Sequence, residues 1–531
     1  MKKRLFFLFI LIAGLQLEAN ALRIKQNHVI YEFDLESNTA ELIELEKNFE
    51  GDLIIPERID MTYIEGPVVS VAENAFREHA GLRDITLPES LTSIGKSAFR
   101  ECKKLRSVNI PQNVKRIEYS TFMGCKALSS VFISEGVEYV DEMAFMACSN
   151  LQSINIPKSV NNIGESAFSY SGLTFLRISG NGNTTIDKMA FKSCLDLKTV
   201  EIGDGVISIG ESAFDYSWRI ESVAIGNHVK TIGNDSFYEC GGLTSVLLGE
   251  AVDSIGAGAF SGCHKLEEIT IPNNVKYIGE NAFYDTGLTT ISIPGNGETT
   301  IEEGAFSNCN SLKTIEIGDG VTMIGVQAFA YCRYAESLVI GNNVKTIGEM
   351  AFTYCTLLNS LSIGESVETI DDNAFYGCCT LKDVVIPDNV KTIGRGAFED
   401  SEQLVSLIIG KSVETIGDGA FYACRVLTDV YVHATIPTEI TESTFDKKVY
   451  KNAILHIPSG CIQNYINTQY WNSFAHIVDD VESSGILLPS TVEKPQSIYD
   501  VNGIRLSHFK HGINILKYKN GKTKKHMYIK S

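Results

Sequence analysis

The chain has 531 residues, more than one hydrophobic core can organise, so it must form several domains or a repeat array. Hydrophobic residues make up 44% of it and charged residues 21%, which excludes wholesale disorder and a collagen-like repeat. The net charge of −19 is uneven: residues 501–531 carry +8 and residues 1–21 carry +2, which leaves −29 on residues 22–500. An acidic body repels phosphate backbones, so nucleic acid is not the expected partner.

The first residues have the layout of a secretory signal. Met1 is followed by three basic residues, Leu5 begins an apolar run that ends at Leu15, and small residues surround a predicted cleavage site after Ala21. The run is too short to cross a bilayer core, which takes about 20 residues. We expect residues 1–21 to be a signal peptide and the mature protein to be secreted or on the outer cell surface, with no transmembrane segment.

A period of 23 residues dominates the rest of the chain. Phenylalanine recurs sixteen times at this spacing without a gap, at positions 76, 99, 122, 145, 168, 191, 214, 237, 260, 283, 306, 329, 352, 375, 398 and 421. Apolar residues nine and eleven places after each Phe alternate as they do in a short strand, for example Val200 and Ile202 after Phe191. The segment just before each Phe fits one helical turn or a tight loop equally well. Each unit is read as one turn of a solenoid, stabilised by its neighbours.

A longer period is superimposed on the 23-residue period. The stretch 196–206 recurs with few changes at 311–321, which is 115 residues, or five units, later. In both blocks one unit, that of Phe168 and that of Phe283, places its leucine one position early and continues with Gly-Asn-Gly before Thr-Thr-Ile. We infer a tandem duplication of a five-unit block, with boundaries near residues 150, 265 and 380.

The repeated pattern I-P-x-x-V-x-x-I-G-x-x-A-F-x-x-C-x-x-L, whose part up to the Phe is seen from Ile271 to Phe283, closely resembles the 23-residue leucine-rich repeat of BspA-like bacterial surface proteins. The resemblance implies an α/β solenoid: a leucine-rich-repeat array of about sixteen turns over residues 76–435, with a parallel β-sheet face. It also implies a β-rich N-terminal cap at 22–75 and a C-terminal cap at 436–480. Adhesion to host matrix proteins or to other microbes is the function that the family suggests.

The end of the chain is a separate small module. Residues 481–497 read as a linker, and the basic segment 498–531, with Ile498 to Arg505 and Gly512 to Leu516, resembles the C-terminal sorting or anchoring modules of exported Bacteroidetes proteins. A plain terminal β-module with a solvated basic face accounts for the same residues equally well.

Eleven of the thirteen cysteines fall three places after a repeat Phe, and the other five units put His79, Ser171, Ser217, Thr286 and Ser401 there. The position favours a small residue, so we predict a buried column of reduced thiols, because cysteine packs as a small hydrophobe. Disulfides stay open as an alternative, since neighbouring strands lie about 4.8 Å apart. No zinc-binding cluster, catalytic motif or phosphate-binding loop is present, so we expect no enzyme activity, metal or cofactor.

Residues eight and ten places after each Phe should face the open side of the sheet. The first of these columns is a ladder of hydroxyl and acidic residues, which fits either solubility and cross-strand packing or ligand contact. Apolar side chains interrupt the two columns and form the candidate ligand-binding face: Phe132, Phe175, Leu247, Val339, Val385, Ile408 and Tyr431. The last three lie on successive strands and predict a contiguous binding patch.

These features predict a surface protein that binds an extracellular protein or glycan. Adhesion through the solenoid face is the leading hypothesis, because solenoids present long faces to their partners. Glycan capture would be favoured by aromatic platforms on the open face, of which Phe132, Phe175 and Tyr431 are the few examples. A structural surface scaffold without a ligand is the third possibility.

Overall fold

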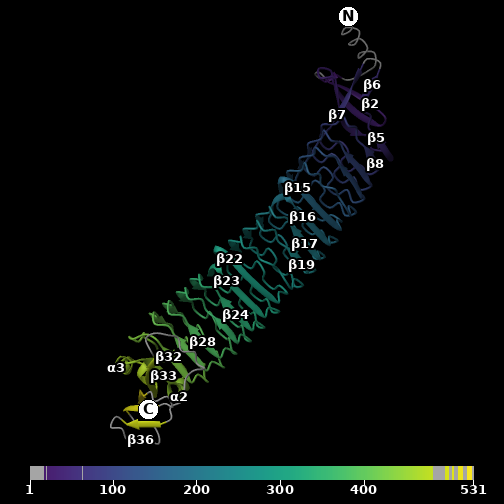
Figure 1. Ribbon diagram of the computed structural model, residues 1–531. Coiled ribbons are helices and arrows are strands. Elements are labelled where there is room, and N and C mark those ends of the chain that lie inside the picture. Colours follow the sequence, from purple (N-terminus) through teal and green to yellow (C-terminus); the bar gives the residue numbers. More distant parts are fainter. Residues whose placement is uncertain are drawn as a thin grey trace. The chain divides into compact units, whose positions relative to one another are not determined.

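A computed structural model describes residues 17–18, 21–61, 64–481, 497–500, 505–506, 512–517 and 523–528 (Figure 1). The chain divides between Leu266 and Glu267 into two compact units. The predicted signal peptide, apart from three residues, and nearly all of the predicted linker lie outside the described residues.

Unit 1 begins with a mostly antiparallel sheet rather than with repeats. Its strands follow the order β1-β2-β3-β4-β7-β6, with β4 and β7 parallel. The side chains of Leu22, Tyr31 and Phe33 on this sheet are buried. The strands are β1 (Leu17–Glu18), β2 (Ala21–Gln26), β3 (Val29–Asp34), β4 (Thr39–Leu45), β6 (Arg58–Met61) and β7 (Ile64–Val71), and β5 (Gly51–Ile54) pairs instead with the first repeat strand.

Fourteen of the sixteen repeats contribute a face strand, which in most of them begins eight places after Phe and pairs in parallel with the face strand of a neighbouring turn. In unit 1 the face strands are β8 (Leu82–Thr86), β10 (Ser107–Ile110), β12 (Ser130–Ile133), β15 (Phe175–Ile186), β16 (Thr199–Ile209), β17 (Ser222–Ile225) and β19 (Ser245–Leu247). In unit 2 they are β22 (Thr290–Ile301), β23 (Thr314–Ile324), β24 (Ser337–Ile340), β26 (Ser360–Ser362), β28 (Asp383–Ile386), β30 (Ser406–Ile409) and β32 (Asp429–Val432).

A second, shorter parallel ladder follows the face strands around each turn. It consists in unit 1 of β9 (Ser93–Ile94), β11 (Arg116–Ile117), β13 (Tyr139–Val140), β14 (Asn162–Ile163), β18 (Thr231–Ile232) and β20 (Ser254–Ile255). In unit 2 it consists of β21 (Tyr277–Ile278), β25 (Thr346–Ile347), β27 (Thr369–Ile370), β29 (Thr392–Ile393) and β31 (Thr415–Ile416). The long strands β15, β16, β22 and β23 run through both ladders.

The segment around each repeat Phe is a tight loop, not a helix. Most turns place two residues in the left-handed region, two before and two after Phe, as Ser97 and Glu101 do around Phe99. Hydrogen bonds within the loop alternate with bonds to the next turn: the Ala98 amide donates to Gly95, and the Phe99 amide donates to Thr121 at 2.9 Å. The helical alternative is therefore wrong for the repeats, and the α/β description fits only the C-terminal cap.

The repeat phenylalanines form a stack through the core of each unit. All sixteen are at most 1% exposed. Successive rings lie nearly parallel, with centroids 5.2 Å apart from Phe168 to Phe191 and 5.0 Å apart from Phe283 to Phe306. Phe445, which falls 24 places after Phe421 and so escapes the strict period, continues the stack at 5.4 Å. The predicted sixteen-turn array is confirmed, with one further stacked ring.

The cysteine column is a column of free thiols, as predicted. All thirteen cysteines lie in the described range 64–481 and none is in a disulfide. Each of the eleven repeat cysteines donates its S–H to the carbonyl of the Phe one turn earlier; Cys102, for example, donates to Phe76 at 2.9 Å. Ser217 makes the same bond to Phe191 at 3.2 Å. The position therefore selects a small residue that can donate a hydrogen bond.

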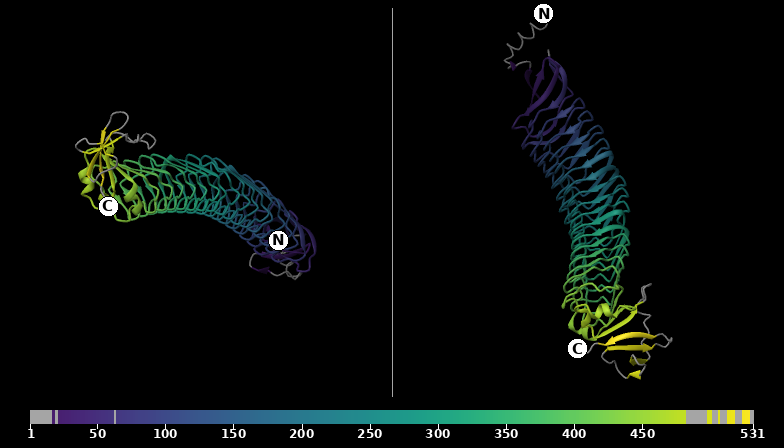
Figure 2. Two further views of the ribbon diagram at one scale, coloured as in Figure 1. Left: turned by 90° about the horizontal axis from the view of Figure 1, so that it is seen from below. Right: turned by 90° about the vertical axis from the view of Figure 1, so that its left-hand side faces the viewer.

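The C-terminal part of unit 2 extends the face ladder instead of ending it. After β32 the sheet adds β33 (Ile454–Pro458) and β34 (His476–Val481) in parallel, and then β38 (Thr523–Tyr528), β37 (Gly512–Lys517) and β35 (Ser497–Asp500) in antiparallel order. Figure 2 shows these yellow strands beside the last green turns. The sheet ends at β36 (Arg505–Leu506), and the described helices are α2 (Lys447–Asn452), α3 (Ile462–Ile466) and the 3₁₀ turn η1 (Trp471–Ser473).

Replacing Phe237 with Ala should lower the free energy of unfolding by about 3–5 kcal/mol, because it opens a cavity between two stacked rings. The exposed Phe132 is the matched control, and its replacement by Ala should change stability by less than about 0.5 kcal/mol. Urea denaturation of both variants measures the difference. Equal effects of the two substitutions would contradict the assignment of the stack as the core.

The thiol column should make the protein sensitive to alkali. Burial raises the pKa of Cys102, Cys148, Cys355 and Cys424 to about 12 and that of Cys194 to about 11, against 9.0 for an ordinary thiol. The unfolded chain therefore releases these protons first as the pH rises. The stability contribution is intact below about pH 9 and is lost between about pH 9 and 12.

Urea midpoints at pH 7.5, 9.5 and 10.5 measure this loss of stability. A variant with Ser at Cys332 and Cys355 should lose less stability with pH, and it should still fold because Ser217 occupies the same repeat position. A pH dependence that is identical in the two proteins would rule the thiols out as its source.

Candidate ligand-binding face

The face strands expose and bury alternate residues as the sequence predicts. On β12, Ser130 and Phe132 are exposed, while Val131 and Ile133 are buried. The same alternation appears on β10, β17 and β24. The open side of the ladder is therefore built from the residues eight and ten places after each Phe.

Some side chains of the first column hydrogen-bond to other members of the same column. Ser107 Oγ donates to Asp84 Oδ1 at 2.6 Å, and Ser222 Oγ donates to Thr199 Oγ1 at 3.5 Å. These bonds link neighbouring strands, so cross-strand packing accounts for at least part of the ladder. The two members expected at Ser153 and Glu268 lie outside any strand, next to the units whose register shifts by one place.

Four of the predicted apolar residues are exposed, but they do not form one patch. The exposed fractions are 63% for Phe132, 66% for Leu247, 41% for Phe175 and 44% for Val339. Polar or small residues pair with them on the adjacent strands, such as Asn109 beside Phe132. Single exposed apolar side chains of this kind are ordinary on protein surfaces.

The predicted patch of Val385, Ile408 and Tyr431 is the opposite case: it is contiguous but covered. These residues pair across β28, β30 and β32 as expected. However, Ile408 is 2% exposed and Tyr431 is 5% exposed, and both pack with Val481 in one buried cluster that Val385 joins from its edge. The prediction of an open binding patch here is wrong, because the chain beyond the last repeat packs onto this part of the face.

A buried histidine extends that cluster. The ring of His456 on β33 stacks on Tyr431 with centroids 4.2 Å apart. Its Nδ1 lies 2.9 Å from Asp480 Oδ1, and its Nε2 lies 3.3 Å from Asp429 Oδ1. A hydrogen-bonded charge cluster under an apolar cover belongs to the interior, so this end of the face is a cap and not a docking surface.

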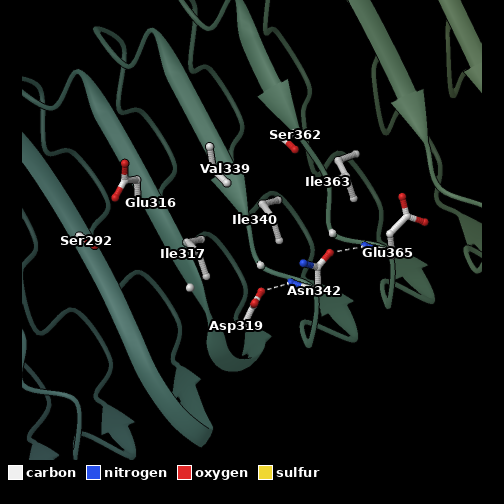
Figure 3. A pocket seen from close by; sticks show the side chains of 13 residues that line it. Ser292, Glu316, Ile317, Asp319, Val339, Ile340, Asn342, Ser362, Ile363 and Glu365 are labelled. Atoms are coloured by element: carbon white, nitrogen blue, oxygen red, sulfur yellow. Dashed lines mark hydrogen bonds between the residues drawn. The ribbon is translucent and has the colours of Figure 1, made fainter. Parts of the chain in front are cut away.

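The open face of unit 2 carries a groove upstream of the cap (Figure 3). It has a volume of about 410 Å³ and crosses β22, β23, β24 and β26. Val339 lies at its centre, between Glu316 and Ser362 on the neighbouring strands. Its thirteen lining residues contain three carboxylates and no lysine or arginine: Ser292, Glu316, Ile317, Gly318, Asp319, Val339, Ile340, Gly341, Asn342, Ser362, Ile363, Gly364 and Glu365.

The floor of the groove is fixed by the backbone. A Cβ on Gly341 would lie 2.5 Å from the Gly318 carbonyl carbon, so only glycine allows successive turns to approach this closely. One residue further on, Asp319 Oδ1 accepts the Asn342 amide at 2.6 Å, and Asn342 Oδ1 accepts the Glu365 amide at 3.2 Å (Figure 3). The polar rim is thus part of the hydrogen-bonding scheme that spaces the turns.

The corresponding part of unit 1 has the same backbone but different charges. Asp204 Oδ1 accepts the Asn227 amide at 2.6 Å, which repeats the Asp319 bond 115 residues earlier. Glu201, the counterpart of Glu316, is bonded at 2.5 Å to Arg177, which stands where unit 2 has Ser292. Glu316 has no ion-pair partner among the described residues, so only the unit 2 groove keeps this carboxylate available.

The sequence predicts Val339 as an exposed residue of the candidate ligand-binding face, but it does not predict the groove around it. Glu316 and Ser292 follow the repeat pattern and carry no motif. The useful signal is the comparison of the two duplicated blocks, in which Arg177 becomes Ser292 and Leu247 becomes Ser362. Both changes replace a large side chain with a small one, and both lie in the groove.

Other features of the described residues do not suggest a different kind of site. No group of three or more His, Cys, Asp or Glu side chains among them is placed to hold a metal ion. The helices in the same part of the chain are all too short and too polar to cross a membrane.

The repeats match a known family of proteins. The model of the BspA type leucine rich repeat region matches residues 69–194, 184–299, 280–403 and 368–472. No curated protein matches the chain.

Solved structures of leucine-rich repeat proteins resemble it. A leucine-rich repeat protein from Bacteroides ovatus is 25% identical, with a TM-score of 0.51, over 77% of this chain and 94% of that one. A leucine rich cell surface protein from Faecalibacterium prausnitzii is 21% identical over the same shares, with a TM-score of 0.29. The pneumococcal vaccine antigen PcpA is 18% identical over 84% of this chain and 95% of its own, also with a TM-score of 0.29.

The family model covers most of the chain, and the Phe stack, parallel face ladder and tight loops provide the structure that its repeats require. The protein belongs to the BspA-type leucine-rich repeat family.

Proposed function

We propose that this protein is a secreted or cell-surface adhesin that binds an extracellular protein, a host matrix protein or a component of another cell, through the open face of its solenoid. The unit 2 groove is the proposed contact. The observation that carries the proposal is the combination in one hollow of exposed carboxylates at Glu316 and Glu365 with the exposed apolar Val339.

The chemistry of the groove favours a basic, extended segment of the partner. Its lining has three carboxylates and no cation, and residues 22–500 as a whole carry −29. The negative electrostatic field of these groups accelerates the approach of a basic partner, and salt weakens this field. Val339 supplies the apolar contact that a charged rim alone lacks, in line with interfaces that combine a small apolar centre with a polar rim.

Glycan binding on the same face is less well supported. Phe132 and Phe175 are exposed but lie on separate strands of unit 1, and Tyr431 is buried. In unit 1, Arg177 occupies the place that Ser292 has in the groove of unit 2. A scaffold without a ligand gives no reason for this replacement.

Surface plasmon resonance of the full exported chain over immobilised fibronectin, laminin and collagen tests the proposal. The substitution Ser292→Arg copies unit 1 and should pair with Glu316. We expect it to weaken binding about tenfold, which corresponds to about 1.4 kcal/mol. Raising the salt from 50 to 500 mM should also weaken binding by the wild-type protein.

The matched control is Arg177→Ser, which opens the equivalent place in unit 1 and should leave the affinity of the unit 2 groove unchanged. Binding that survives Ser292→Arg at full strength would exclude the groove as the contact. Binding confined to a glycan array would favour the carbohydrate alternative, and binding to neither set would favour the scaffold.

A further inference from the structure

A cluster of side chains on the looped edge of unit 1 departs from the repeat in several places at once. It lies on four successive turns, around Phe168, Phe191, Phe214 and Phe237. The duplicated block replaces four of its five members, retaining one Tyr: Tyr170, Lys192, Asp215, Tyr216 and Tyr238 correspond to Asp285, Ser307, Ala330, Tyr331 and Thr353. The common fold therefore does not require this combination.

Two of the tyrosines are held in a costly conformation. Tyr170 has a φ of 58° and Tyr216 a φ of 55°, in the left-handed region that bulky residues avoid at a cost of about 1–2 kcal/mol each. Most other turns use glycine or a small or acidic residue at this position. Both side chains are about half exposed, so burial does not offset the cost. The loop imposes this conformation on every turn, so the distinguishing feature here is a bulky, half-exposed ring at a strained position.

An ion pair that is also costly joins the turn between the two tyrosines to the turn of Tyr216. Lys192 Nζ lies 2.7 Å from Asp215 Oδ2, and the lysine side chain is 25% exposed while the aspartate side chain is 6% exposed. Asp215 Oδ1 is buried and has no hydrogen-bond partner among the described residues. Burying such a pair costs desolvation energy that Ser307 and Ala330 avoid in the second block.

These residues are held in a fixed arrangement. The amides of Tyr170, Ser193 and Tyr216 each donate to the carbonyl of the next turn, at 3.0, 2.8 and 2.9 Å. Tyr170 and Tyr216 are therefore two turns apart, roughly 10 Å at the usual strand spacing. The small Ser193 stands between them at the same repeat position. Tyr238 braces Tyr216 edge-to-face at 5.5 Å.

Lys192 belongs to the turn between the two tyrosine turns. Its Nζ is 5.7 Å from the ring centroid of Tyr216. A hydrogen bond to Asp215 holds the pKa of Lys192 above its ordinary value despite partial burial, and charge interactions with Tyr170 and Tyr216 act in the same direction. The lysine therefore stays charged and can donate hydrogen bonds to a ligand.

We infer that Tyr170 and Tyr216 form a clamp for the ring of a neutral saccharide, with Lys192 as the hydrogen-bond donor and Asp215 as the residue that positions Lys192. The two turns of spacing between the tyrosine backbones, roughly 10 Å, leave room for one six-membered ring. Aromatic rings offer an apolar surface to the C–H groups of a sugar, and their hydroxyls offer polar contacts at the rim.

The charged groups around the clamp favour a neutral ligand over an anion or a cation. The Lys192–Asp215 and Lys188–Glu211 pairs are each neutral as a whole. Asp235 adds an acidic group beside them, and burial and then the charges of Asp215 and Glu211 raise its pKa. The surroundings therefore repel an anion, and the ammonium group repels a cation. A flat aromatic ligand would leave the lysine donors unused. A neutral polyol ring uses both the apolar walls and the donor.

The clamp is independent of the groove proposed above, since it lies on another edge of the turns and in the other unit. Isothermal titration and saturation-transfer NMR of the full chain with cellobiose, lactose and N,N′-diacetylchitobiose test it. At least one of these sugars should bind. Lys192→Ser and Tyr170→Asn should each weaken that binding at least tenfold.

The stability of the variants provides a second readout. Asparagine tolerates the left-handed region, so Tyr170→Asn should leave the Tm unchanged or raise it while binding falls. Tyr331→Asn, at the counterpart of Tyr216 in the second block, is the control and should not affect sugar binding. The clamp is refuted if none of the three sugars binds or if both clamp variants bind normally. Binding of N-acetyltryptophanamide in place of the sugars would overturn it in favour of an aromatic ligand.

Discussion

The structure depends on one constraint: the equivalent atoms of successive turns must stay in register with one another. The Phe rings stack about 5 Å apart, the loop amides bond to the next turn, and each repeat cysteine bonds back to a Phe carbonyl. Each of these interactions is weak alone and repeats in nearly every turn. A residue inserted into any turn would break all of them together, which is why the period holds for sixteen units.

This constraint also determines where variation is tolerated. The buried columns admit few residue types: the cysteine position accepts cysteine, serine, threonine or, once, histidine, because it needs a small group or one with a hydrogen-bonding atom. The exposed columns are free to change, and the two duplicated blocks have changed there. One block closes its face with Arg177 and Glu201, whereas the other leaves Glu316 available. The same duplication separates the tyrosine clamp of unit 1 from its altered counterpart in unit 2. The two candidate binding sites are thus differences between copies of one backbone.

In the C-terminal part of the chain, the pattern of single strands does not predict which apolar side chains are exposed. Val385, Ile408 and Tyr431 have the spacing of an exposed apolar patch, but in the structure they lie beneath Val481 and beside the ring of His456. Solenoids need their ends covered, because a terminal turn has no neighbour to bury its apolar face. An apolar run on the last face strands is therefore better interpreted as the seat of a cap than as a site for a partner.

The sequence by itself determined the repeat length, sixteen of the stacked turns and the inward residues, because these follow from a strict period in which local pattern and core packing agree. It favoured reduced cysteines but left disulfides open, and the structure shows free thiols. It left the loop conformation undecided, since Ala and Phe before a polar residue suit a helix as well as a tight loop. Only the tertiary structure decided that question, through hydrogen bonds between turns that have no signature within one unit. The groove and the clamp were equally hidden, because both combine residues 23 or more positions apart. Whether such residues form a site depends on the space and charge between neighbouring turns, which no single repeat contains.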